Sequence, residues 1–122
     1  MKVWTSYYGS KGPLPPGTIG VAVSRSVPEW AEWKAQEIVT LAAPKDLGSL
    51  YWAENYRRQM SRDRLGEVYA QLLEIEKRTG REPVLLCYEK DANNCHRTIL
   101  WNMLRDEFGV EGGELGQVGL GL

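Results

Sequence analysis

Residues Val84 to Phe108, V-L-L-C-Y-E-K-D-A-N-N-C-H-R-T-I-L-W-N-M-L-R-D-E-F, decide the fold of this chain. The apolar run Val84 to Tyr88 is typical of a short strand that is buried on both faces. A polar loop follows it, and Asn93 or Asn94 is expected to cap a helix over Cys95 to Phe108. A buried strand that leads through a short loop into a helix is the repeating unit of a parallel sheet.

Further strands are expected on the N-terminal side of this unit. Val3 to Tyr8 is β-branched and aromatic, and Thr18 to Val23 is almost entirely apolar. Ser10 to Gly17 lies between them and contains three prolines and two glycines, which makes it a loop. A short helical turn over Val27 to Ala35 and a third short strand over Ile38 to Ala42 follow.

Two helical segments occupy the middle of the chain. Leu50 to Met60 has helical character, and Ser61 to Thr79 is the strongest helix, with Gly80 suited to its C-terminal cap. Apolar positions recur in it at helical spacing, at Leu65, Val68, Tyr69, Leu72 and Ile75. Strands separated by helices predict a single-domain α/β fold, Rossmann-like, with a small, mainly parallel sheet flanked by helices.

The size and charge of the chain limit its class. Its 122 residues suit one domain, with residues 1–110 as the α/β body and residues 111–122, which hold five glycines, as an edge strand or loose tail of it. A net charge of −1 argues against strong nonspecific binding to nucleic acid. No segment approaches the ~20 apolar residues of a membrane span, and no signal-peptide pattern is present, so we expect a cytoplasmic protein without a membrane partner. Cys87 and Cys95 are then expected to be thiols rather than a disulfide.

Candidate functional side chains follow the ends of the predicted strands. Ligands bind outside the carboxyl ends of the strands in a sheet of this kind, so side chains at those ends would meet at one edge. The ligand-binding candidates there are Tyr7, Tyr8, Ser24, Arg25 and Cys87, and Glu89 is a candidate general base.

The start of the last helix carries Cys95, His96 and Arg97. A helix N-terminus presents free N–H groups and a partial positive charge, which favour anions and a cysteine thiolate. Arg97 adds a planar fork that suits phosphate or carboxylate, so it is a further ligand-binding candidate. Cys95 and His96 join Glu89 as the catalytic candidates.

These residues also have a structural interpretation. Cys87 lies in an apolar strand and would pack there as a small hydrophobe. Glu89 would pair with Arg97 or Arg25 in a buried ion-pair network. Arg97 opposes the helix dipole, so a structural role for it requires a carboxylate partner or an anion.

A zinc site is the third interpretation. Cys87, Cys95 and His96 are zinc ligands by type, and Glu89 would be a fourth. The spacing is not that of a paired C-x-x-C site, and neighbours such as Cys95 and His96 rarely point at one ion on a regular helix. We therefore rank zinc below anion binding and expect no resident metal or other cofactor.

The same run resembles the family named domain of unknown function 488. Its members carry a strand with Leu-Leu-Cys-x-Glu and a Cys-His-Arg that opens a helix, here Leu85 to Glu89 and Cys95 to Arg97, with Ala92 where a proline is common. The N-terminal half is similar to the compact branch of phages and microbes, through Thr5 to Tyr8, Ser24-Arg25, Pro28 to Trp30 and Ala43-Pro44. The resemblance implies a Rossmann-like fold near nucleotide- and nucleic-acid-processing domains, and it implies no settled activity.

These features together predict a domain that binds an anionic, nucleotide-like ligand at the carboxyl edge of the sheet. Whether the domain is an enzyme is open, and N-glycosidic or phosphoester cleavage would be the reaction. The alternatives are a non-catalytic nucleotide or nucleic-acid binding module, for instance in phage–host conflict, and a structural Cys/His metal site. The sequence contains neither G-x-G-x-x-G nor G-x-x-x-x-G-K-S/T, and it does not determine the oligomeric state.

Overall fold

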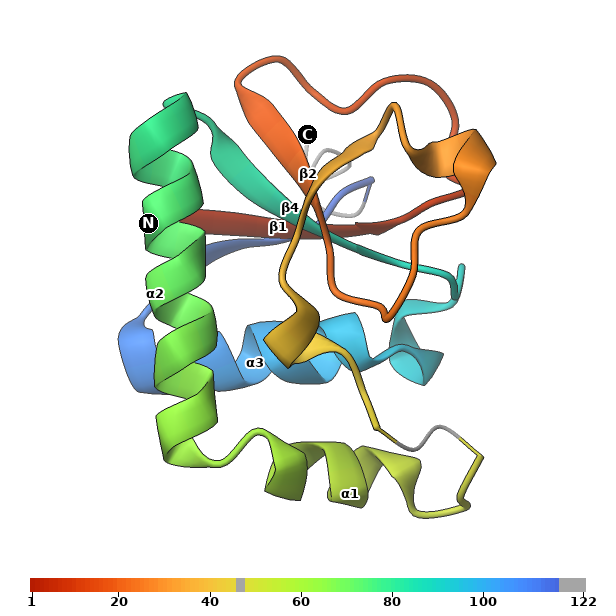
Figure 1. The fold of residues 1–122 in the computed structure, drawn as a ribbon, viewed down its shortest axis with the longest axis vertical. Helices are drawn as coiled ribbons and strands as arrows, with labels where there is room; N and C mark the ends of the chain where they lie inside the picture. Colours follow the sequence, from red (N-terminus) through yellow and green to blue (C-terminus); the bar gives the residue numbers. More distant parts are fainter. Residues whose placement is uncertain (46–47, 117–122) are drawn as a thin grey trace.

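The computed structural model describes residues 1–45 and 48–116. Strands in this part of the chain form one sheet in which all neighbours are parallel. The spatial order is β3-β2-β4-β1-β5 (Figure 1). The strands are β1 (Lys2–Tyr7), β2 (Thr18–Ala22), β3 (Ala35–Ile38), β4 (Glu82–Cys87) and β5 (Glu111–Glu114). The expected single-domain α/β fold with a small parallel sheet is confirmed.

The helices pack together on the sheet. They are α1 (Trp52–Gln59), α2 (Arg62–Thr79) and α3 (His96–Phe108), with short 3-10 turns at η1 (Glu29–Ala31), η2 (Thr40–Ala42) and η3 (Ala92–Asn94). Both α2 and α3 contact β4, and α1 packs on the side of α3 that is farther from the sheet (Figure 1). Gly80 and Gly109 end α2 and α3 in the left-handed conformation expected of helix caps. None of the helices in the described residues is long and apolar enough to cross a membrane.

Each strand sends alternate side chains to the two faces of the sheet. The main core lies between the sheet and the α-helices, where Leu85 of β4 meets Leu72 of α2 and Leu100 of α3 in one buried cluster. Leu86 faces the other side and belongs to a smaller cluster, which η1 covers through Ala31. Side chains on both faces of β4 are buried, which is why apolar residues follow one another without alternation in this strand.

The connections between strands divide between these two faces. The links β1–β2 and β2–β3 lead toward the β3 edge through the loop and η1 of the smaller cluster. The links β3–β4 and β4–β5 lead toward the β5 edge through the α-helices. Opposite directions on opposite faces give every crossover the same hand. The neighbours β2 and β4 therefore send their onward connections apart, which creates the crevice where α/β sheets bind ligands.

The predicted third strand over Ile38 to Ala42 was wrong. The strand is β3, Ala35–Ile38, and it lies at the edge of the sheet with alternating half-buried and exposed residues. An edge strand has little apolar content, so a search for apolar runs misses it. The more apolar residues after β3 form the turn η2 instead. The last bond to β2 is the one that the Val39 N–H donates to the Ala22 carbonyl at 2.9 Å. The expected helical turn over 27–35 shrinks to η1.

The start of the last helix differs from expectation. Cys95 occupies the N-cap position of α3, and neither asparagine does. Asp91 caps the preceding turn η3, by accepting a hydrogen bond from the Asn93 N–H at 3.0 Å. On the C-terminal side, the predicted edge strand exists as β5, and residues 117–122 of the predicted tail lie outside the described residues.

Candidate functional site

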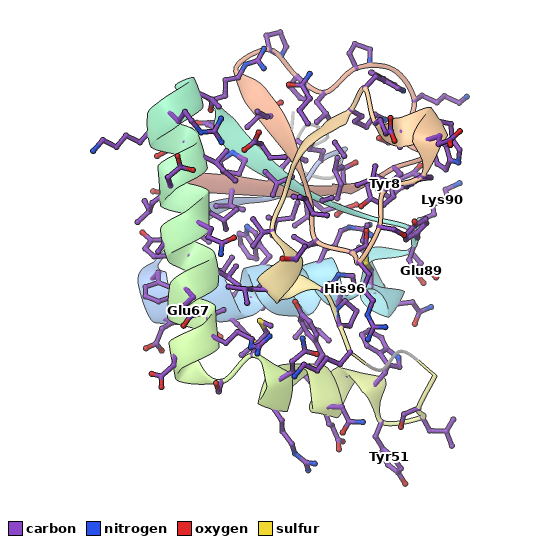
Figure 2. All side chains as sticks on the ribbon, viewed as in Figure 1. Tyr8, Tyr51, Glu67, Glu89, Lys90 and His96 are labelled. Carbon is purple, nitrogen blue, oxygen red and sulfur yellow. A yellow bond between two sulfur atoms is a disulfide. The ribbon has the colours of Figure 1, made fainter. Side chains whose placement is uncertain are left out.

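A pocket of about 470 Å³ opens at the carboxyl ends of β2 and β4. This volume lies within the range of about 300–1,000 Å³ that small-molecule sites occupy. Figure 2 shows Glu89 and His96 at this end of the molecule, far from Glu67 on α2. The predicted site residues that line the pocket are Ser24, Arg25, Cys87, Glu89, Cys95 and His96.

Tyr7 and Tyr8, which we expected at the ligand, do not line this pocket. Tyr7 lines a separate groove beside the loop after β1. Tyr8 is buried, and its hydroxyl lies 2.5 Å from Ser24 Oγ, whose own hydrogen is donated to the Ser26 carbonyl at 2.7 Å. The Tyr8 hydroxyl is therefore the donor, and burial raises its pKa. Tyr8 supports the Ser24 to Ser26 wall of the pocket from behind.

His96 is the first residue of α3, and its ring is buried. The Nε2 atom lies 2.6 Å from the Val23 carbonyl, so Nε2 carries the proton and the lone pair is on Nδ1. Burial is the main cause that lowers the pKa of His96 to about 4, opposed by the Val23 hydrogen bond and assisted by the charge of Arg97. At physiological pH the ring is neutral, and its Nδ1 lies 3.9 Å from the Cys95 sulfur.

Cys87 ends β4 and Cys95 precedes α3, and both are buried in the pocket wall. Residues 88–94 lead the chain back to the end of β4, and the structure pairs the two cysteines in a disulfide. We expected free thiols. The sequence did not show that the loop would bring Cys95 back beside Cys87, because that proximity depends on the tertiary structure. The two Cα atoms are 7.3 Å apart, which exceeds the usual range of about 4.4–6.8 Å for bonded cysteines.

Arg97 is fully buried, and the structure does not bring it to the pocket. Its Nε and Nη2 atoms donate to the two carboxylate oxygens of Glu114 at 3.0 and 2.9 Å. Nη1 donates to Cys87 Sγ at 3.1 Å and to the Glu89 carbonyl at 2.5 Å, and Nη2 also donates to the Lys90 carbonyl at 3.3 Å. All five N–H groups therefore have protein partners.

The alternative of a buried ion-pair network of Arg97, Glu89 and Arg25 was wrong about which residues pair. The carboxylate partner of Arg97 is Glu114, which lies in β5, and Glu89 supplies only a main-chain oxygen. The side chain of Glu89 is exposed in the pocket, and so is that of Arg25. The requirement for a carboxylate partner was nevertheless correct, because Glu114 neutralises the buried guanidinium.

Arg25 and Lys45 provide the positive charge of the pocket. Arg25 donates through Nε to the Pro44 carbonyl at 3.1 Å and through Nη2 to the Lys45 carbonyl. Among the described residues no partner is found for its other three N–H groups. The two main-chain bonds hold the guanidinium in place, and its remaining donors can serve a ligand.

Sequence reasoning missed two aromatic residues of the pocket, Tyr88 and Trp52. Tyr88 is 51% exposed, and its ring lies edge-on to that of Tyr8 with centroids 5.0 Å apart. Its position directly after β4 is the signal that could have identified it as a site residue. Trp52 comes from α1, and Lys45 comes from the segment after η2, where its N–H donates to Gln59 of α1. No local pattern identified either residue as part of the site, because tertiary packing brings them to this edge.

The pocket thus combines groups with distinct chemical abilities. Arg25 and Lys45 can bind an anion, Tyr88 and Trp52 can stack on a planar ring, and the Glu89 carboxylate can accept a proton. In the disulfide form neither sulfur is a nucleophile. Reduction releases the Cys95 thiol beside the free Nδ1 of His96, which is the arrangement of a base-activated thiol.

The comparisons with known proteins identify a family and no individual relative. A family model described as the active DUF488-N3 subclade, DUF488-N3a, matches residues 25–108. The matched region includes Arg25, the whole of β4 and α3, and therefore most of the pocket. No curated protein and no solved structure matches the chain. Since the match covers well over half of its residues, the chain belongs to the DUF488 family, in the DUF488-N3a branch.

Proposed function

We propose that this chain binds an anionic, nucleotide-like ligand in the pocket between the ends of β2 and β4. The observation that supports this most is the combination of cationic and aromatic side chains at the point where the connections of β2 and β4 separate. Arg25 and Lys45 would hold phosphate groups, and Tyr88 or Trp52 would stack on the base. Arg97 enters this proposal as a positioning residue, because its donors are all used within the protein.

The proposal extends to a reaction on the bound ligand, by N-glycosidic or phosphoester cleavage. Glu89 is the candidate general base, since its carboxylate is exposed within the pocket. Cys95 is the candidate nucleophile of the reduced protein, with Nδ1 of His96 beside it. A cytoplasmic location, which we also propose, would favour that reduced form.

A non-catalytic binding module is the second candidate. The disulfide between Cys87 and Cys95 favours it, because this form keeps the pocket and its cations but has no thiol nucleophile. Such a module would sequester a nucleotide or nucleic acid, for instance in phage–host conflict. Turnover assays on reduced wild type, Cys95→Ala and Glu89→Ala separate the two candidates. Ligand binding that survives both changes, without conversion of ligand in any form, would favour the binding module.

The first prediction tests the anion site through Arg25. Arg25→Gln removes the charge but keeps N–H donors for the Pro44 and Lys45 carbonyls, so the loop stays supported. A panel of nucleosides, nucleotides and inorganic phosphates is titrated by calorimetry in the presence of a metal chelator. We expect nucleotides to bind wild type, and Arg25→Gln to weaken them by about 10- to 100-fold, the value of one charged hydrogen bond.

Arg57→Gln is the matched control. Arg57 is an exposed arginine on α1 that lines none of the described pockets, so its loss of charge should leave the affinity unchanged. The anion-site proposal fails if no phosphate-bearing compound binds wild type. It also fails if Arg25→Gln and Arg57→Gln weaken binding equally, since the effect would then come from net charge alone.

A further inference from the structure

Three buried side chains in the pocket wall are close enough to share one ion. Cys87, Cys95 and His96 each offer one ligand atom, and these atoms all lie within 4.8 Å of one another. In a tetrahedral zinc site, bonds of about 2.3 Å to sulfur and 2.0–2.1 Å to nitrogen place the ligand atoms about 3.5–3.8 Å apart. Once the disulfide is reduced, the two sulfurs have to move apart to reach this spacing, and the imidazole nitrogen lies within 4.8 Å of both.

The backbone between Cys95 and His96 removes the objection that neighbouring residues point apart. Cys95 is not part of the helix: as N-cap it is extended, with φ −126° and ψ 139°, and helical geometry begins at His96. This change of conformation turns both side chains toward the end of β4. The Cys95 sulfur and His96 Nδ1 are 3.9 Å apart as a result, close to the spacing in a tetrahedral site.

Outer partners orient two of these three ligands. The Val23 carbonyl accepts the Nε2–H of His96 at 2.6 Å, which directs the Nδ1 lone pair toward the sulfurs. A metal-bound histidine is typically fixed in this way, by a carbonyl or carboxylate on its other nitrogen. Arg97 donates to the Cys87 sulfur at 3.1 Å, and such a donor stabilises a thiolate more than a neutral thiol.

The charges of the buried cluster also balance when a divalent ion is present. Two thiolates offset an ion of charge +2, the imidazole is neutral, and Arg97 is already neutralised by Glu114. The Cα separation of 7.3 Å between the cysteines, too wide for an ordinary disulfide, suits two sulfurs on either side of an ion.

We propose that, when its cysteines are reduced, the chain binds a divalent ion of the zinc class through Cys87, Cys95 and His96. Two sulfurs and one imidazole select zinc or cobalt over magnesium or calcium, which prefer oxygen ligands. Glu89 lines the pocket but does not belong to the cluster of ligand atoms. The described residues add no fourth side chain to this cluster, so water or a molecule in the pocket that the three ligands line would complete the coordination.

Cobalt(II) is the probe of this site, and its binding is the second prediction. The full chain is reduced without oxygen, its two thiols are counted under denaturing conditions, and cobalt(II) is titrated into the native protein. We expect one ion per chain, a thiolate-to-cobalt charge-transfer band and the strong visible bands of a tetrahedral site. Zinc should displace the cobalt. Cys95→Ser and His96→Gln should each weaken binding by more than the roughly 10–100-fold that loss of a hydrogen-bond partner of a metal ligand costs.

Arg57→Gln is the control, because it removes an exposed charge on α1 that lines none of the described pockets, and it should bind cobalt as wild type does. The metal proposal is overturned if reduced wild type shows no charge-transfer band, or if the cysteines stay bonded under reductant. Equal cobalt binding by wild type and His96→Gln overturns it too. These readouts use the metal alone, whereas the nucleotide titration uses chelator, so either proposal can fail without the other.

Discussion

At the scale of single residues, burial decides which side chains are available for chemistry. Arg97 and His96 both begin α3, and both are buried. Glu114 neutralises the Arg97 guanidinium, and three further acceptors satisfy its remaining donors. His96 is neutral because burial and the nearby charge of Arg97 disfavour its charged form, although the Val23 carbonyl accepts its Nε2–H. Arg25 remains exposed, and it is the arginine that a ligand can reach.

The third prediction concerns the protonation of His96. Its pKa is 6.5 in the unfolded chain and about 4 in the folded one, so the unfolded state binds more protons between these values. The free energy of unfolding should therefore fall as pH drops from 6.5 through 4, with a total loss of about 3 kcal/mol from this residue. Urea denaturation across this range measures it.

His96→Gln is the reference variant, because the glutamine amide can still donate toward Val23 but does not titrate. Carboxylates contribute equally to both proteins, so the difference between the two stability curves isolates His96. That difference should shrink as the pH falls toward 4. Curves that stay parallel over the whole range would show that the neutral, buried ring has been misassigned.

At the scale of elements, close packing of the strands restricts one glycine. Gly20 lies in β2, where a Cβ atom would sit 2.0 Å from the Lys34 carbonyl oxygen and 2.8 Å from a Leu86 methyl group. The first of these neighbours is main chain and cannot move aside. The pairing of β2 with β3 shifts register at the same point, so the absence of a side chain permits the approach of the edge strand.

The fourth prediction compares two glycine substitutions. Gly20→Ala should destabilise the protein by about 1–3 kcal/mol or more, because the clash forces β2 and β3 apart. Gly66→Ala is the matched change in α2, where no atom lies within 4 Å of the added methyl group, and it should stabilise the protein by about 0.5–1 kcal/mol. Chemical denaturation of both variants measures the two effects. Equal effects of the same sign would contradict this packing.

At the scale of the whole molecule, the Arg97–Glu114 pair links the C-terminal edge strand to the pocket. Glu114 in β5 binds Arg97 in α3, and Arg97 in turn holds the main-chain carbonyls of Glu89 and Lys90 just after β4. Thr5 of β1 donates to the same carboxylate at 2.6 Å. The family match ends at residue 108, so this carboxylate lies beyond the matched region.

The fifth prediction tests that link. Glu114→Gln keeps the shape of the side chain but leaves the fully buried guanidinium without a counter-charge, so stability should fall by about 3 kcal/mol. The control is Asp106→Asn, which breaks an exposed pair with Arg105 and should change stability by less than about 0.5 kcal/mol. Thermal and urea unfolding give both values. If Glu114→Gln proved as mild as the control, the buried pair would not hold β5 in place.

Much of the fold could be predicted because local patterns marked it. The apolar runs gave β1, β2 and β4 to within two residues, and helical spacing with terminal glycines gave α2 and α3. The edge strand β3 could not be found this way, since its burial alternates weakly and no apolar run marks it. Among the predicted site residues, Cys87, Glu89, Cys95 and His96 lie at strand ends or at the helix start, and the structure places them around one pocket.

The sequence by itself determined a parallel α/β domain and the edge of the sheet where side chains gather, because hydrophobic periodicity and strand direction are local properties. The tertiary structure alone decided that Arg97 turns inward to Glu114, and that Lys45 and Trp52 reach the pocket. It also brought Cys87, Cys95 and His96 within reach of one ion. Each of these contacts depends on which distant segments pack together, and a buried charge takes whichever partner that packing supplies.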